Sequence, residues 1–154
     1  MAAAFRAAGI PLKFVEPADA IITVDNIKCF VKCKRIQTEK ALEEPVRQAS
    51  SQIEKRLNQE ASVKPRGLIA IDISKTVNTN GTLYFSTPSA DYLSRWIDSN
   101  LEAFLTRNRT KLTSHLDPRV CGVLLYLRTP AVIEDEELLT NFHRLFPSPN
   151  SGQR

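Results

Sequence analysis

Two nearly continuous apolar runs, at residues 67–73 and 120–127, constrain the fold more than any other feature of this chain. Runs of this kind are typical of strands that are buried on both faces, so other elements must cover them on two sides. Each run follows a segment with helical periodicity. This alternation of helices and strands predicts an α/β fold.

The first helix is predicted from apolar residues that recur at intervals of four, three, four and four: Leu42, Val46, Ala49, Ile53 and Leu57. This spacing is typical of an amphipathic helix with one buried face. Pro45 fits only near the first turn of such a helix, so residues 38–43 are expected to form a separate turn.

A second helix is predicted to open at Thr87-Pro88, with the threonine as its cap and the proline in the first helical position. Asp117-Pro118 is expected to end it. The buried residues expected on this helix are Leu93, Ile97, Leu101, Phe104, Leu105 and Leu112. Apolar residues within 134–146 also fit a helix, although Pro147 follows closely.

A chain of 154 residues suits one compact domain, and 42% hydrophobic residues are enough for one core. We predict a single α/β domain over residues 1–146 and a polar tail over residues 147–154. The alanine-rich residues 1–9 are typical of the end of a helix. A helix this short is marginal alone, which indicates that the chain begins inside a longer one.

Composition limits the function classes. The 21 Lys+Arg and 17 Asp+Glu give a net charge of +4, which permits phosphate contact without indicating it. Three cysteines cannot all pair with one another, and no charged-then-apolar signal segment precedes them, so a reducing cytoplasm is expected. No apolar stretch approaches roughly 18 residues, so no membrane span is predicted. Nothing in the sequence indicates an oligomeric state.

Residues 19–35 predict a hairpin with a defined register. Two β-branched runs flank Asp25-Asn26, and asparagine tolerates the positive φ that a two-residue turn requires. With these two residues as the turn, Asp19 lies opposite Lys32. Because side chains alternate along a strand, Lys34 lies on the same face as this pair.

This segment resembles the core of the PD-(D/E)xK phosphodiesterase superfamily, including versions of that core in bacterial proteins of unassigned role. The resemblance covers about residues 9–75 and rests on Pro17-Ala18-Asp19, the hairpin, Lys32-Cys33-Lys34-Arg35 and a helix that carries Gln52. It implies a restriction endonuclease-like α/β core, with a mixed central sheet flanked by helices. In that family, an Asp and an acidic residue two positions before a Lys hold a divalent metal, and the Lys helps to position the attacking water.

The resemblance implies catalytic roles for Asp19, Lys34 and Gln52, with Mg²⁺ or Mn²⁺ as the cofactor if the protein is active and none otherwise. Asp19 matches the first metal-holding acid and Lys34 the motif lysine. Lys32 departs from the pattern, because an ammonium at the second acidic position repels a metal ion and can pair with Asp19 instead. Glu16 is an alternative ligand, but it lies beyond the hairpin. An impaired metal site is therefore expected.

Four basic residues, Lys28, Lys32, Lys34 and Arg35, lie within eight positions and predict contact with nucleic-acid phosphates. A solvated strand edge that discourages aggregation is the alternative interpretation. Three function classes stay open: a metal-dependent phosphodiesterase, a noncatalytic nucleic-acid-binding protein, and a protein-interaction domain in which the basic strand is incidental.

Other residues with reactive side chains are expected to have structural roles. Cys29 and Cys33 lie four positions apart on a strand, or roughly 13 Å, which is too far for a shared zinc ion. They are expected to be buried, inert thiols. His115 and His143 have no Cys or His at metal spacing and are expected on the surface. Asp72 is expected to be a hydrogen-bonded carboxylate at a strand end.

Overall fold

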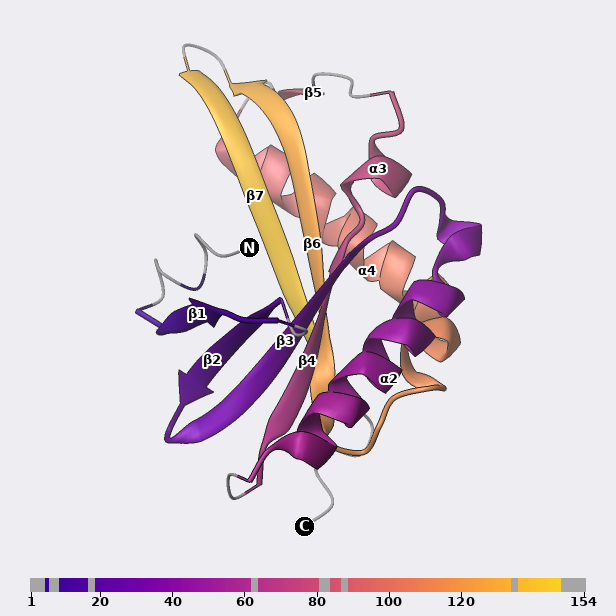
Figure 1. The fold of residues 1–154 in the computed structure, drawn as a ribbon. Helices are drawn as coiled ribbons and strands as arrows, with labels where there is room; N and C mark the ends of the chain where they lie inside the picture. The colour runs from indigo at the N-terminus through magenta and orange to yellow at the C-terminus, as the bar shows by residue number, and fades with distance from the viewer. Residues whose placement is uncertain are drawn as a thin grey trace.

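The structure, a computed structural model, describes residues 5, 9–16, 19–61, 64–80, 84–86, 89–133 and 136–147. The described strands form one seven-stranded sheet in the order β1-β2-β3-β4-β6-β5, and β7 also pairs with β6 (Figure 1). The predictions for residues 1–4, 6–8, 17–18, 87–88 and 148–154 lie outside the described residues. No helix in the described ranges is long and apolar enough to cross a membrane.

The elements alternate as the sequence predicts for an α/β fold. The strands are β1 (Leu12–Phe14), β2 (Ala20–Val24), β3 (Ile27–Arg35), β4 (Arg66–Asp72), β5 (Tyr84–Ser86), β6 (Val120–Ile133) and β7 (Glu136–Pro147). The helices are η1 (Glu39–Ala41), α2 (Glu43–Gln59), α3 (Ser74–Val77) and α4 (Ala90–Thr113). Strands β3, β4, β6 and β5 are parallel, whereas β2 is antiparallel to both β1 and β3, and β7 to β6. The sheet is therefore mixed and flanked by helices.

The β2–β3 hairpin has the predicted turn and register. Asp25 and Asn26 form the turn with φ of 49° and 63°, which is the geometry of a two-residue hairpin with two positive φ values. Ile21 lies opposite Phe30 across the two strands. The predicted alignment of this segment is confirmed up to the start of β2.

Helices α2 and α4 cover one face of the sheet (Figure 1). Their predicted apolar residues are buried against that face, together with Phe30, Ile69, Ile71, Val123 and Leu125. The opposite face carries a smaller cluster: Ala20, Ile22, Cys29, Val31, Leu68, Ala70 and Leu124. Phe5, Ile10 and Leu12 pack against this second cluster. Strands β4 and β6 contribute residues to both clusters and are thus covered on both faces, as the apolar runs at 67–73 and 120–127 predict.

Two predicted boundaries are wrong. Helix α4 begins at Ala90, and its cap is Ser89 instead of Thr87, because the Ser89 hydroxyl accepts the Tyr92 N–H at 3.4 Å. The helix ends at Thr113, four residues before Asp117.

The segment at 134–146, whose apolar residues fit a helix, contains strand β7 instead, which pairs with the long strand β6 from Ile133 back to Gly122. The apolar residues of this segment therefore belong to a strand, because pairing with β6 decides its structure and the local spacing of apolar residues does not reveal that pairing.

Gly67 lies where α2 approaches β4 too closely for a larger side chain. A Cβ atom at this position would overlap Cγ2 of Ile53 and lie 3.2 Å from Cγ2 of Val120. We expect Gly67→Ala to lower the free energy of unfolding by roughly 1–3 kcal/mol, because the overpacked core must shift. Urea denaturation measures this loss. In Ile53→Ala the obstructing atom is gone, so Gly67→Ala should cost less there; equal costs in both backgrounds contradict the close approach.

Candidate functional site

Asp19 and Lys32 form an ion pair on the hairpin. The Lys32 Nζ lies 3.0 Å from Asp19 Oδ1, and the Cys33 backbone N–H donates to Asp19 Oδ2. The Lys32 side chain is only 15% exposed and that of Asp19 39%. The Asp19 N–H donates to the Val31 carbonyl, which extends the hairpin ladder by one residue. Both oxygens of this carboxylate therefore accept bonds from strand β3.

This donor set does not fit a divalent metal ion. Mg²⁺ and Mn²⁺ prefer several oxygen ligands, but the second acidic position holds an ammonium that already binds Asp19. Among the described residues, no group of three or more His, Cys, Asp or Glu side chains could hold a metal. Asp19 was the one predicted metal ligand, and in the structure it binds a lysine and an amide.

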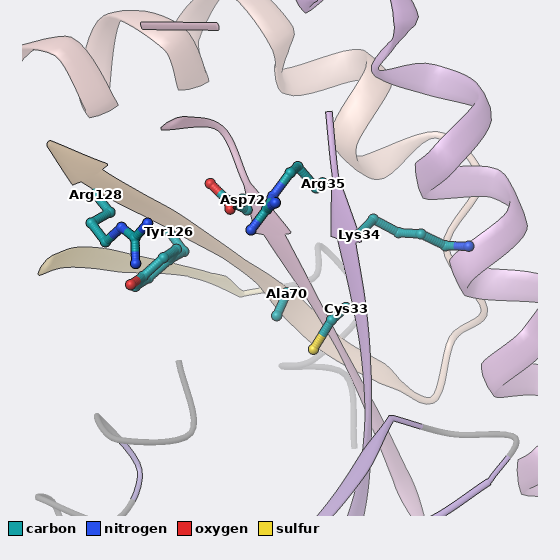
Figure 2. A pocket seen from close by; sticks show the side chains of 7 residues that line it. All are labelled: Cys33, Lys34, Arg35, Ala70, Asp72, Tyr126 and Arg128. Carbon is teal, nitrogen blue, oxygen red and sulfur yellow. Dashed lines mark hydrogen bonds and ion pairs between the residues drawn. The ribbon is translucent and has the colours of Figure 1, made fainter. Parts of the chain in front are cut away.

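Lys34 follows Lys32 on the same face of β3. Its side chain is half-buried and extends toward the helices, away from the opposite face of the sheet (Figure 2). In the part of the chain that the structure describes, no acidic side chain pairs with it. Lys34 therefore leaves one uncompensated positive charge beside the Asp19–Lys32 pair.

Helix α2 runs antiparallel to β3 and packs against the face of the sheet that carries Phe30 (Figure 1). The Arg56 guanidinium lies over the Phe30 ring at 5.2 Å from its centroid, and among the described residues its buried Nε has no hydrogen-bond partner. Gln52 lies one helical turn before Arg56 on α2. The Gln52 side chain is exposed, and in the described part of the chain no hydrogen bond joins it to Lys32.

The predicted basic cluster is divided between two faces and largely neutralised. Lys28 pairs with Glu60 at 3.2 Å on the helix-covered face. Arg35 lies on the opposite face, where its Nε donates to Asp72 Oδ2 at 2.9 Å. The four cations therefore do not form one free basic surface.

A pocket of about 470 Å³ opens on the face opposite α2 and α4 (Figure 2). It lies where β3 and β4 end and β6 continues, since Arg35 pairs in register with Asp72 and Asp72 with Tyr126. Its described lining residues are Cys33, Lys34, Arg35, Ala70, Asp72, Tyr126 and Arg128. The pocket thus combines two arginines, one lysine, one carboxylate and one aromatic ring.

Asp72 has the structural role that the sequence predicts, at the end of β4. Its Oδ1 accepts the Ser74 N–H at 2.9 Å, while its Oδ2 binds Arg35. Burial opposes ionisation, but the hydrogen bonds from Ser74 and Arg35 outweigh it and hold the pKa of the Asp72 carboxyl below its ordinary value. The carboxylate is therefore charged at neutral pH and fixes one edge of the Arg35 guanidinium.

Asp72→Asn is expected to weaken the acid dependence of stability. A carboxyl whose pKa is lowered by folding contributes stability above the unfolded-state pKa of about 3.9, and that contribution is lost as pH falls through the folded-state pKa. The variant should therefore be less stable at neutral pH and lose less between pH 7 and 2.5. Urea unfolding measures this, with the exposed Asp98→Asn as the control. An unchanged pH dependence in Asp72→Asn contradicts the assignment.

Of the two thiols that are expected to be buried, Cys29 is buried and Cys33 is only half-buried. Burial, with the charge of Asp19, raises the pKa of the Cys33 thiol to about 11. Cys29 is buried, but it hydrogen-bonds Cys121, which lowers the pKa of the Cys121 thiol to about 7. His115 is exposed as predicted and lies 3.0 Å from Glu43. The side chain of His143 lies outside the described part.

Sequence reasoning missed three functional candidates, Arg56, Tyr126 and Arg128. Arg56 could have been found from its helical spacing, since it follows Gln52 by four residues. Tyr126 and Arg128 join the pocket only through the β4–β6 register, which no short-range pattern contains. In comparisons with known proteins, no family model and no curated protein matches this chain. The resemblance to the PD-(D/E)xK superfamily therefore stays a prediction.

Proposed function

We propose that this chain is a nuclease-like protein that binds nucleic-acid phosphates without metal-dependent cleavage. The observation that carries the proposal is the ion pair between Lys32 and Asp19, at the positions where the resembling family holds a metal ion. An ammonium there balances the Asp19 charge without generating a metal-bound nucleophile. Lys34 and Arg56 supply positive charge toward a phosphate, because neither pairs with an acid among the described side chains.

Electrostatic phosphate contacts give a specific experimental signature. We expect a labelled DNA duplex or single-stranded RNA to bind in EDTA and to lose affinity steeply as salt increases, because each neutralised phosphate releases counterions. Lys34→Gln should weaken binding and reduce the salt slope by about one contact. Fluorescence anisotropy measures both, and Lys55→Gln on the exposed side of α2 is the matched control.

The same experiment separates the three function classes. Cleavage of the labelled strand that requires Mn²⁺ and Asp19 would establish a phosphodiesterase and refute the proposal. A protein-interaction domain would leave DNA and RNA unbound even at low salt. For that class the specific observation is the short strand β1, which lies at the edge of the sheet that the described strands form and leaves Phe14 62% exposed.

A further inference from the structure

The pocket behind β3 and β4 has the size and position of a ligand site. Its volume of about 470 Å³ lies within the range of small-molecule pockets. It is formed at the ends of two adjacent parallel strands and on the neighbouring β6, so rigid sheet backbone positions its side chains. Cys33 and Arg35 lie on the opposite face of β3 from Lys32, so this pocket is separate from the Asp19–Lys32 pair.

Two arginines from the outer strands of the pocket favour an anion. Arg35 uses its Nε on Asp72, and its side chain is 66% exposed, so its terminal nitrogens remain available to a ligand. Arg128 is exposed, and the Ser74 hydroxyl accepts its backbone N–H at 2.8 Å, which fixes the strand but not the guanidinium. The two guanidiniums outnumber the one carboxylate of the lining, and Lys34 adds further positive charge at the pocket. Guanidinium forks of this kind bind phosphates with paired hydrogen bonds.

The lining also provides an apolar and aromatic surface. Tyr126 is half-buried beside Arg128, and Cys33 and Ala70 form a less polar part of the wall (Figure 2). Arg128 lies next to the Tyr126 ring, so a cation and an aromatic face line the same part of the pocket (Figure 2). An aromatic side chain next to cations suits a ligand that joins a phosphate to a planar base.

We propose that this pocket binds a single nucleotide, whose phosphate contacts Arg35 and Arg128 and whose base stacks on Tyr126. The nucleotide is either a free nucleoside monophosphate or the phosphorylated end of a nucleic-acid strand. The inference does not depend on the proposed function, because the Asp19–Lys32 pair and the side chains of Arg35, Tyr126 and Arg128 lie on opposite faces of the sheet.

The test is a titration of the full chain with AMP, adenosine and inorganic phosphate in turn, in which NMR chemical shifts report the affinity for each ligand. AMP should bind roughly tenfold more tightly than either fragment, since it combines both contacts. Arg128→Gln should weaken AMP roughly ten- to a hundredfold, the effect expected for a charge-assisted contact, while Arg109→Gln on the exposed surface of α4 should not. Tyr126→Leu should weaken AMP and leave the affinity for inorganic phosphate unchanged.

The proposal would be overturned if the wild type bound AMP and adenosine with equal affinity. It would also be overturned if Arg128→Gln bound AMP as tightly as Arg109→Gln does. A trinucleotide with and without a 5′-phosphate distinguishes the sources: tighter binding of the phosphorylated form than of AMP supports a strand end, and weaker binding supports a free nucleotide. Arg56→Gln separates this inference from the proposed function, because Arg56 does not line the pocket, and the variant should weaken duplex binding and leave AMP binding unchanged.

Discussion

Replacing Lys32 with glutamate is expected to create a Mn²⁺ site that the wild-type chain lacks. The substitution puts a second carboxylate opposite Asp19, where Cβ atoms lie about 5 Å apart, and removes the ammonium that binds Asp19. Without metal, the two carboxylates repel each other and the variant should be less stable than wild type. With Mn²⁺ at a hundred times its Kd, binding should restore about 2.7 kcal/mol.

Thermal unfolding of Lys32→Glu with and without MnCl₂ measures this gain. For a chain of this size, the expected rise in Tm is roughly 5–10 °C. Lys32→Gln removes the cation without adding a ligand and should show no rise. The double variant with Lys32→Glu and Asp19→Asn should also show no rise in Tm, because the site needs both carboxylates. A metal-independent Tm in Lys32→Glu alone contradicts the proposed alignment with the metal-binding family.

The second large effect is expected from Asp19→Ala. This change removes the partner of a mostly buried ammonium and leaves the Cys33 N–H without its acceptor. Loss of hydrogen bonds to a charged group costs about 1.5–3 kcal/mol, and loss of the carboxylate beside a mostly buried ammonium adds to this cost. We expect a loss of roughly 3 kcal/mol in the free energy of unfolding, measured by urea denaturation.

The same loss should be partly reversed in a double variant. Asp19→Ala with Lys32→Met removes both charges of the pair, so the buried ammonium no longer contributes a desolvation cost, whereas the Cys33 N–H still loses its bond to Asp19. We expect this double variant to be more stable than Asp19→Ala alone. The exposed pair of Arg47 and Glu44 supplies the control, because Glu44→Ala should change stability little. If the double variant is no more stable than Asp19→Ala, the pair does not have the stabilising role assigned to it.

The sequence predicts the site well where local rules suffice. Asp25-Asn26 defines the turn, and strand alternation from that turn aligns Asp19 with Lys32 and puts Lys34 on the same face. Charge alone indicates that an ammonium opposite a carboxylate will pair with it. These statements need only the period of a strand and the geometry of a two-residue turn.

The sequence does not predict contacts that depend on parallel-strand register. Arg35 was grouped with the lysines of its strand, but its odd position sends it to the other face, and its partner Asp72 lies on β4. Parallel pairing between β3, β4 and β6 is set by packing of the whole sheet, not by a turn. The pocket that joins Arg35 to Tyr126 and Arg128 is therefore invisible in the linear pattern.

The most direct test is an anomalous-diffraction map from crystals of the wild-type chain and of Lys32→Glu soaked in MnCl₂. We expect no Mn²⁺ peak beside Asp19 in wild type, with the Lys32 ammonium still paired to its carboxylate. Lys32→Glu should show a peak roughly 2 Å from oxygens of residues 19 and 32, the usual distance for small divalent cations. A Mn²⁺ ion bound to Asp19 in the wild-type crystals, with Lys32 displaced, would contradict the account.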